Sequence, residues 1–399
     1  MEYKYKVSIC MIVKDCEADL QRCLDSFLPI IMAKDDDTGK LLSELIIIDT
    51  GSSDRTIKVA KKYTSKVSKK LFIPWSFSDA RNYGIAKASG ERIMIVDSDD
   101  ELPQEALYPL MMLLFGTKPM TGTVFTLIKS FRSRDRKQSS TLAQPRIFDN
   151  DGKSIYTGAV HNKPRCNEPY VFADNVTFNH HGYIFQDKPG LIEKKLTDRS
   201  LPMLEENIEK IPTDLHTLNH LIKSYYIIHE HKKVIKYGEV FVSEFKKVEY
   251  SEGWRAYLES FIHLSQSYVL LGDIENAERI KLETETYSMD VAGIYFALGN
   301  YYASNQDRAK AKEYIEQGVT AASKPKDLYA SLMSNNDDDV LPVMYNWLAA
   351  YYFSEGDFDK AGTLIRKGIL SDRNNMHRWD IFNEPHCIKR VIKNELEVA

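Results

Sequence analysis

The chain has 399 residues, of which 43% are hydrophobic and 28% charged, a mixture typical of a globular protein long enough for two domains. Its 53 basic and 57 acidic residues give a net charge of −4, which provides no overall positive field for binding nucleic acid or an anionic membrane. The longest apolar run, Tyr108–Phe115, is far shorter than the roughly 20 residues that cross a bilayer, and the run Val7–Val13 lacks the cleavage site of a signal peptide, which predicts a cytoplasmic protein without a membrane partner.

The first part of the sequence has the alternation of an α/β domain. Short apolar runs of strand length are separated by amphipathic stretches of helix length, which predicts βαβ units and a mostly parallel sheet. The runs are Val7–Val13, Leu45–Ile48, Leu71–Ile73 and Ile93–Val96. Further strands are expected at Thr123–Ile128, Arg146–Phe148, Ser154–Val160 and Val171–Phe178, with a hairpin turn at residues 149–152. We expect this domain to occupy residues 1–205.

Residues 206–399 are predicted to form an all-α domain of tetratricopeptide-like helical repeats. A tyrosine is followed by Gly or a polar residue and then by Ala, as Tyr268-Gly272-Ala277, Tyr302-Gln306-Ala311 and Tyr352-Gly356-Ala361. The first two tyrosines are 34 residues apart, the period of tetratricopeptide helix hairpins. We interpret the polar segment Ser334–Asp339 as a loop inserted before the third unit, and a weaker fourth unit surrounds Tyr226 and Ile235. A helical array without a defined repeat is the alternative.

Acidic side chains follow the predicted strands at their carboxyl ends, the edge at which open α/β sheets bind ligands. Asp97 and Asp99 come directly after the strand Ile93–Val96, in a D-x-D spacing that places two carboxylates close enough to hold one divalent cation. Carboxylates suit Mg²⁺ or Mn²⁺, whose usual second partner is a diphosphate. A solvated acidic turn is the alternative, and because Asp100 and Glu101 follow directly, the ligand assignment is open to a shift by one residue.

The segment Asp49-Thr50-Gly51-Ser52-Ser53-Asp54 also follows a predicted strand and precedes a predicted helix. Its Gly and Ser residues permit a tight turn, in which Asp49 can accept a hydrogen bond from a base N–H or a ribose hydroxyl. The glycine-rich motifs of dinucleotide-binding and P-loop proteins are absent from the sequence. If phosphates bind here, a metal ion is therefore expected to neutralise them.

Four motifs in this order resemble those of the family 2 glycosyltransferases of the GT-A fold. They are Cys10-Met11-Ile12-Val13-Lys14, Asp49-Thr50-Gly51-Ser52-Ser53-Asp54, Trp75-Ser76-Phe77-Ser78-Asp79-Ala80-Arg81-Asn82 and Asp97-Ser98-Asp99. The resemblance covers residues 1 to about 200, and the helical repeats resemble those of a subgroup in which the same two parts are fused. Within this subgroup, the chain is similar to the sublancin-type peptide S-glycosyltransferases, which attach a hexose to bacteriocin precursors.

The resemblance implies a role for each matching residue. The nucleotide of a UDP-sugar is expected at Val13, Lys14, Asp49, Trp75, Arg81 and Asp97, and a metal ion at Asp97 and Asp99. For Arg81 the alternative is a surface salt bridge. Trp75 is expected either to stack on the base or to pack in the core.

Two later segments resemble motifs of the same family. Residues 156–163 resemble a Gly-x-Val-His-Glu stretch, but Asn162 stands where Glu is expected, so His161 becomes the candidate catalytic base. A structural His within the sheet is the alternative. His180-His181-Gly182-Tyr183 resembles a His-x-Gly-Tyr motif, in which His180 is expected to complete the metal shell.

The resemblance thus implies an inverting, metal-dependent hexosyltransferase that uses a UDP-hexose, with Mn²⁺ or Mg²⁺ as cofactor. The acceptor is expected to be a Cys or Ser side chain of a peptide held by the helical repeats, which alternatively form a homodimer contact or brace the first domain. Two other functions stay open, namely a glycosyltransferase for cell-surface polysaccharide and a non-catalytic helical-repeat binding protein. No motif specifies the donor hexose, the choice of S- or O-linkage or the number of sugars added.

Overall fold

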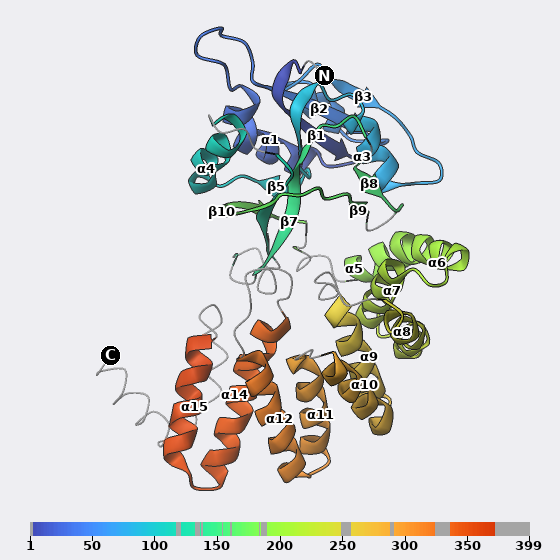
Figure 1. The fold of residues 1–399 in the computed structure, drawn as a ribbon, viewed down its shortest axis with the longest axis vertical. Coiled ribbons are helices and arrows are strands. Elements are labelled where there is room, and N and C mark those ends of the chain that lie inside the picture. The colour runs from blue at the N-terminus through green and yellow to red at the C-terminus, as the bar shows by residue number, and fades with distance from the viewer. Residues whose placement is uncertain are drawn as a thin grey trace. The chain divides into compact units, whose positions relative to one another are not determined.

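The computed structural model divides the chain into two compact units, Met1–Pro189 and Gly190–Ala399 (Figure 1). It describes residues 3–116, 121–131, 136, 139–153, 155–159, 162–182, 184, 190–248, 257–287, 291–323 and 336–371. The domain boundary expected between residues 205 and 206 falls inside helix α6 (Leu201–Lys210). It does so because α5 (Leu191–Lys195) and the π-helical turn η1 (Leu196–Ser200) run directly into α6, so the helical chain starts earlier than the repeat pattern indicates.

The first unit is built on an eight-stranded sheet with the order β3-β2-β1-β4-β7-β6-β10-β5. The first four strands in this order are parallel, as the sequence predicts, whereas β7 is antiparallel to both of its neighbours. Strand β10 is parallel to β6 and antiparallel to β5. The strands are β1 (Tyr5–Val13), β2 (Ser43–Asp49), β3 (Val67–Lys69), β4 (Gly90–Ile95), β5 (Asp100–Glu101), β6 (Thr123–Phe131), β7 (Ser139–Asp149) and β10 (Tyr170–His180).

Helices cover both faces of the parallel strands, which explains why those strands read as continuous apolar runs. One face of β1 presents Val7, Ile9 and Met11 to a core that α1 shares, and the other face presents Cys10 to a core beneath α3. The helices of this unit are α1 (Glu17–Ile31), α2 (Thr56–Ala60), α3 (Phe77–Ile85) and α4 (Gln104–Phe115). This two-sided packing fixes the carboxyl ends of β1, β2 and β4 at one edge of the sheet.

Two local predictions in this unit are wrong. Leu71–Ile73, expected as a strand, lies in the loop after β3, where Ile73 is 91% exposed and is followed by Pro74, which has no N–H for a sheet. Residues 149–152 do not turn a hairpin, because β7 pairs with β4 and β6 while β8 (Tyr156–Thr157) pairs with β9 (Lys163–Pro164) in a separate two-stranded sheet.

The second unit contains helices that pair as antiparallel hairpins, and the predicted class of an α/β domain followed by helical repeats is therefore confirmed. Its remaining described helices are α7 (Leu215–Ile227), α8 (His231–Phe245), α9 (Leu258–Leu270), α10 (Ile274–Thr286), α11 (Ala292–Ser304), α12 (Arg308–Ala322), α14 (Asn336–Ser354) and α15 (Phe358–Ser371). Among the described residues, no helix is long and apolar enough to span a bilayer.

The tyrosine–turn–alanine pattern marks one hairpin at each occurrence. The middle residue turns the chain with a positive φ, at +80° for Gly272, +65° for Gln306 and +81° for Gly356. An Asp follows each of these residues, its side chain accepts from the first turn of the next helix, and its backbone N–H donates to the carbonyl of the repeat tyrosine. The alanines are buried where the two helices cross.

Two details of the repeat differ from expectation. The fourth unit is present as α7 and α8, but it is shifted by one residue, with Tyr225 as the repeat tyrosine, His229 at φ +60° and Val234 buried. The segment Ser334–Asp339 is helical from Asn336 onward, because α14 starts there, while residues 334 and 335 lie outside the described part of the chain.

Candidate active site

Two loops at the carboxyl edge of the sheet bind each other through a reciprocal set of hydrogen bonds. Asp15, which follows β1, accepts from the Ser53 N–H at 2.7 Å, and its own N–H donates to Ser52 Oγ at 3.0 Å. The carboxylate of Asp49 is fully buried and accepts from the N–H groups of Gly51 and Ser52, each at 3.2 Å. The Asp49 loop is therefore a rigid turn, built by the residue expected to contact the nucleotide.

The other predicted nucleotide residue on β1 takes part in the same arrangement. The carbonyl of Val13 accepts from the Thr50 N–H at 2.9 Å, and Val13 pairs with Asp49 in the sheet register. Lys14, one residue on, is exposed at the edge. The structure thus brings Val13, Lys14 and Asp49 to one place.

Trp75 lies directly before α3, which begins where Ser76 Oγ accepts from the N–H of Asp79. Its ring packs edge-on against Phe77, with 4.9 Å between centroids, and against Phe72, with 6.3 Å. The indole Nε1 is buried and has no acceptor among the described residues. The ring thus packs against aromatic side chains, stacking on the base stays a prediction, and the indole N–H can donate a hydrogen bond to a ligand oxygen.

Two arginines contact Asp97, namely Arg81 on α3 and Arg146 on β7, and Arg146 is not among the residues predicted from the sequence. Arg81 Nη2 lies 2.6 Å from Asp97 Oδ1, and Arg146 Nη1, on β7, lies 2.8 Å from Asp97 Oδ2. Arg146 also reaches Asp100 Oδ2, at 3.2 Å from its Nη2. The side chain of Arg146 is 5% exposed, so these contacts form in a largely dry environment.

These arginines keep Asp97 ionised. Burial by itself would raise the pKa of Asp97, but the charges of Arg81 and Arg146 outweigh it and hold that pKa far below its ordinary value. Burial would likewise lower the pKa of Arg146, and the carboxylates of Asp100 and Asp97 raise it instead. Asp97 is therefore a fixed anion between two fixed cations.

The Tyr156 side chain lies next to the Arg81–Asp97 ion pair. Its ring lies 5.3 Å from the guanidinium of Arg81, and its backbone is held by Asn82, whose Nδ2 donates to the Tyr156 carbonyl at 2.7 Å. Asn82 Oδ1 accepts in turn from the Tyr156 N–H at 3.0 Å. The adjacent residues Arg81 and Asn82 thus position the guanidinium and the Tyr156 ring that lies next to it.

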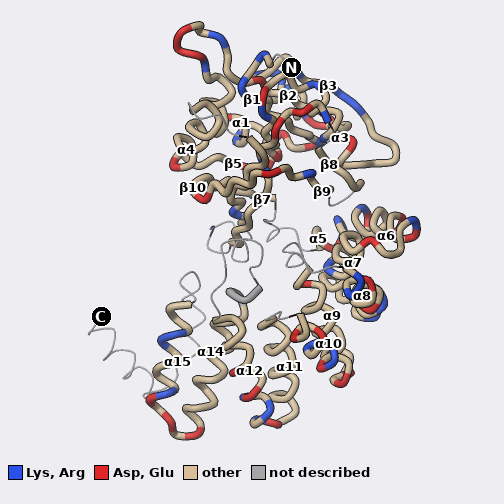
Figure 2. The backbone as a smooth tube through the Cα atoms, viewed as in Figure 1, with Lys and Arg blue, Asp and Glu red and all other residues tan. Residues whose placement is uncertain are grey.

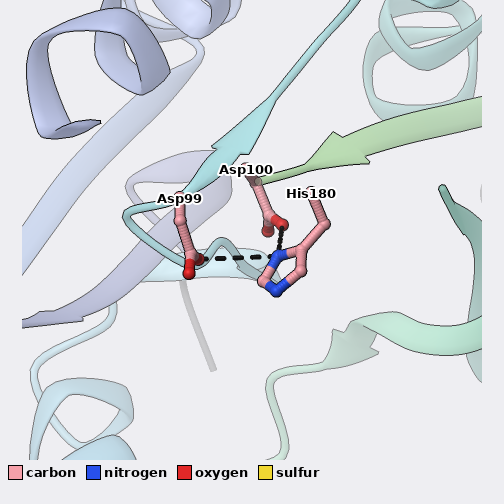
Figure 3. Close-up of side chains that lie close together, drawn as sticks. All are labelled: Asp99, Asp100 and His180. Carbon is pink, nitrogen blue, oxygen red and sulfur yellow. Dashed lines mark hydrogen bonds and ion pairs between the residues drawn. The ribbon is translucent and has the colours of Figure 1, made fainter. Parts of the chain in front are cut away.

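The pairing of β5 with β10 creates a second cluster next to Asp97. His180 is the sheet partner of Asp100, so its Nδ1 comes within 2.9 Å of Asp100 Oδ1 and 3.5 Å of Asp99 Oδ1 (Figure 3). Asp99, Asp100 and His180 offer one ligand atom each, all within 4.8 Å of one another. Asp97 is not part of this group, and each of its two oxygens faces an arginine.

Gly182 leaves the space into which this cluster fits. A Cβ at this position would lie 2.3 Å from Asp99 Oδ2 and 2.7 Å from His180 Nε2. Any larger residue therefore pushes Asp99 and His180 away from their places. This gives a physical reason for the Gly of the His-x-Gly motif.

The electrostatics of the cluster suit a cation. Burial raises the pKa of Asp99 to about 6. Burial would lower the pKa of His180, but its hydrogen bond to Asp100 and the nearby carboxylates raise that pKa. Two carboxylates and one imidazole are a donor set that Mn²⁺ accepts readily and Mg²⁺ accepts through the oxygens, so the residues fit a divalent metal.

One predicted site residue lies outside the described part of the chain. His161, the candidate base, is among the residues that the structure does not describe, and its role stays a prediction. Asn162, which stands where the family has Glu, is described, and its Nδ2 is buried without an acceptor among the residues that the structure describes. The contribution of Arg146, by contrast, had a signal in the sequence, since a charged residue inside a predicted strand of a protein core needs a partner.

Comparison with known proteins assigns both units to families. Residues 8–176 match the model described as Glycosyl transferase family 2, and residues 292–325 match that of the Tetratricopeptide repeat. The first unit is thus a family 2 glycosyl transferase domain, and the second contains a tetratricopeptide repeat. The predicted combination of these two parts is confirmed.

Individual relatives share segments of the chain. A TPR repeat-containing protein of Synechococcus elongatus is 40% identical over 121 residues, which are 30% of this chain and 27% of that protein. The poly(ribitol-phosphate) beta-glucosyltransferase of Bacillus spizizenii is 33% identical over 158 residues, 38% of this chain and 24% of that protein. The chain therefore covers about a quarter of the length of each. A solved structure of S. aureus TarS, residues 1–349, has 14% identity and a TM-score of 0.34, with 90% of each chain covered.

Proposed function

We propose that this chain transfers a hexose from a UDP-sugar to an acceptor, with the help of a divalent metal ion. The observation that carries this proposal is the contact between two arginines and Asp97 beside the Asp99–Asp100–His180 cluster, at the edge where open α/β sheets bind ligands. The match of residues 8–176 to the glycosyl transferase family supports it.

Asp99, Asp100 and His180 would hold the metal ion, Mn²⁺ or Mg²⁺, and the ion would supply positive charge that neutralises the diphosphate and makes UDP a better leaving group. Val13, Lys14, Asp49 and Trp75 would bind the nucleoside, with Arg81 and Asp97 fixed beside it. This assignment keeps Asp99 and His180 as expected metal ligands and replaces the expected ligand Asp97 by Asp100, which lies three residues further along the chain.

The transfer is a single displacement. The acceptor oxygen or sulfur forms a bond to C1 of the hexose from the face opposite UDP, while the bond from C1 to the phosphate oxygen breaks and its electron pair leaves with UDP. His161 takes the acceptor proton. The configuration at C1 is therefore inverted, and the protein needs no covalent nucleophile.

We infer that the acceptor is the Cys or Ser side chain of a peptide, as in bacteriocin precursors, because stacked helix hairpins form an extended surface suited to a polypeptide. A base with a pKa near that of His favours a thiol over a hydroxyl. The cytoplasmic location and the homodimer stay predictions of the sequence.

A second candidate acceptor is a cell-surface polymer. The Bacillus spizizenii relative is named as a poly(ribitol-phosphate) beta-glucosyltransferase, and its similar segment is 33% identical to this chain. The non-catalytic alternative is less well supported, since the metal-side and nucleotide-side groups converge and only Asn162 departs from the family pattern.

The first test is the release of UDP from UDP-glucose, UDP-N-acetylglucosamine and UDP-galactose, with and without Mn²⁺. We expect slow metal-dependent release from one donor and a loss of about 1000-fold in Asp99→Asn, because a metal ion contributes several kcal/mol to the transition state. Asp36→Asn, an exposed carboxylate in another loop, is the matched control. If no donor is hydrolysed and calorimetry detects no UDP binding, the proposal fails.

The acceptor is tested separately. The active donor is incubated with a Cys-containing peptide, its Cys→Ser form and poly(ribitol phosphate), and the products are identified by mass spectrometry. Sugar on the peptide supports the first candidate, and sugar on the polymer alone replaces it by the second.

A further inference from the structure

One segment of the first unit departs strongly from the acidic balance of the chain. Residues 55–78 contain no Asp or Glu, although the whole chain has a net charge of −4. We define the basic edge as six exposed lysines, five from this segment and one just after α3, namely Lys61, Lys62, Lys66, Lys69, Lys70 and Lys87.

Two lysines of the basic edge that are distant in the sequence, Lys70 and Lys87, contact the same aromatic ring. Strand β3 is an edge strand of the sheet, and Figure 2 shows basic residues at this strand and at the start of the loop that follows it. Lys70 Nζ lies 3.9 Å from the centroid of the Tyr83 ring, and Lys87 Nζ lies 4.6 Å from the same ring. Segments on either side of α3 therefore bring their charges together. Among the ion pairs of the described residues, this set contributes only that between Lys66 and Glu44.

Two apolar side chains project from the same place. Leu71 is 61% exposed and Ile73 is 91% exposed, and we call these two residues the apolar tip. Phe72, between them, points inward, with its ring 6.1 Å from that of Tyr83 and 6.3 Å from that of Trp75. The partly buried Phe72 ring anchors the loop, while its two neighbours stay exposed to water.

Protection of an edge strand does not explain this combination. Lysines on an edge strand prevent it from pairing with another chain. Strand β3 has only three residues, so the six lysines of the basic edge are more than its protection requires. A soluble polyanion would also be attracted by the lysines but would gain nothing from the apolar tip. Positive charge around a small exposed apolar loop fits a surface that is anionic outside and apolar beneath.

We propose that the basic edge and the apolar tip dock this protein on an anionic lipid bilayer, with Leu71 and Ile73 entering the headgroup region. The absence of a spanning segment, from which the sequence analysis predicts no membrane partner, concerns insertion across the bilayer and not docking at its surface. The net charge of −4 is also no obstacle, because the interaction of exposed charges is screened beyond about 8 Å at physiological ionic strength and a local patch therefore acts by itself.

Docking in this way would bring the candidate active site close to the membrane. The N–H of Lys70 donates to the carbonyl of Asp49 at 2.8 Å, and Leu71 packs so closely on Gly51 that a Cβ there would lie 2.6 Å from its Cδ2. The docking loop is thus attached to the Asp49 turn of the nucleotide site. The proposal does not depend on sugar transfer, and its test needs no donor.

The test is co-sedimentation of the full chain with vesicles of phosphatidylcholine alone or mixed with phosphatidylglycerol. We expect binding to the mixed vesicles only, decreasing with salt. Replacing Lys61, Lys62 and Lys69 with Gln should weaken this binding about 100-fold, because each lysine near an anionic surface contributes roughly a factor of five. The matched control replaces Lys210, Lys232 and Lys236, three exposed lysines of the helical unit, with Gln and should leave binding unchanged.

A single substitution separates a lipid surface from a soluble polyanion. Ile73→Ser should weaken vesicle binding about tenfold through lost apolar contact, and should leave binding to poly(ribitol phosphate) in solution unchanged. Equal vesicle binding by Ile73→Ser and the native chain would overturn the proposal in favour of a polyanion site. Absence of vesicle binding, or equal loss in the two triple variants, would overturn it outright.

Discussion

Ionisable side chains are arranged differently in the two units of this protein. In the first unit, Arg81, Asp97 and Arg146 converge at one point of the sheet edge, where the two arginines are 13% and 5% exposed. In the second unit, the repeat tyrosines of three successive hairpins donate to glutamates, as in Tyr268–Glu239, Tyr302–Glu278 and Tyr352–Glu316. Charged side chains that converge at one point indicate a binding site. A contact that recurs at the same position in successive helix hairpins indicates a stabilising interaction of the repeat.

The energetic reason lies in desolvation. A buried ion pair loses the hydration of two charges, and folding alone gives little reason to keep it. A neutral hydroxyl that donates to a partly exposed carboxylate loses little hydration and contributes a modest stabilisation at each repeat. The following predictions test this difference, beginning with the largest effect.

Removal of the cation that joins the two clusters should have the largest effect. Arg146→Met leaves Asp97 and Asp100 buried without one of their partners, and we expect unfolding free energy to fall by about 3–5 kcal/mol, with loss of UDP binding in the folded fraction. Urea unfolding and calorimetry measure the two quantities.

Arg92→Met is the matched control for Arg146→Met. Arg92 is a buried arginine on the neighbouring strand β4, where it pairs with Asp149 and donates to the Gly122 carbonyl at 2.8 Å, away from the candidate site. It should lose similar stability and keep UDP binding below its melting temperature. Equal loss of UDP binding in both variants would show that Arg146 acts only through stability.

Filling the space at residue 182 should weaken the metal site without removing a ligand. Gly182→Ala places a methyl group against Asp99 and His180, and we expect Mn²⁺ affinity to fall about 100-fold, the upper range for changes next to metal ligands. Mn²⁺ titration followed by electron paramagnetic resonance measures this. The control is Gly238→Ala in the helical unit, where an added Cβ is also crowded, at 2.7 Å from Leu264 Cδ1, but away from the metal cluster. Unchanged Mn²⁺ affinity would remove this cluster as the metal site.

Acid should destabilise the helical unit through His263. This residue stacks on Tyr226 with 4.2 Å between ring centroids, and burial lowers its pKa to about 4. In the unfolded chain the pKa of a His side chain is near 6.5, so the unfolded state binds the proton more tightly than the folded state. The unfolding free energy therefore falls as the pH drops from about 6.5 to about 4, by roughly 2 kcal/mol between pH 7 and pH 5.

His263→Phe keeps an aromatic ring on Tyr226 and should remove this part of the pH dependence, whereas His216→Gln in the same unit should keep it. Chemical denaturation at pH 7 and pH 5 compares them. A native chain that is equally stable at both values contradicts the prediction.

The smallest effect is expected in the repeated contacts. Tyr302→Phe removes a hydroxyl that donates to Glu278 at 2.7 Å, and it should cost about 1 kcal/mol of unfolding free energy with unchanged UDP release. Tyr301→Phe, at the adjacent position, is the control. A large loss of UDP release in Tyr302→Phe would mean that the periodic contacts also serve the site.

Sequence reasoning predicted what depends on local pattern. The parallel strands β1, β2 and β4 and the hairpins at Tyr268 and Tyr302 follow from apolar runs and from the repeat period. The pairing of β5 with β10 does not, because a two-residue strand has no pattern of its own, and this pairing is what puts Asp100 opposite His180. Arg146 was missed for a related reason, since its partners are 46 and 49 residues away and meet it only through the antiparallel pairing of β7 with β4.

The bridging position of Arg146 also has a thermodynamic consequence. One guanidinium contacts Asp97, on the proposed nucleotide side, and Asp100, in the proposed metal cluster, so a ligand that shifts Arg146 toward one carboxylate would change the affinity for the other ligand as well. Linkage requires the effect to be reciprocal, with nucleotide altering metal affinity by the same factor as metal alters nucleotide affinity. The two ligands would then behave as one cooperative unit, in which neither has a fixed affinity independent of the concentration of the other.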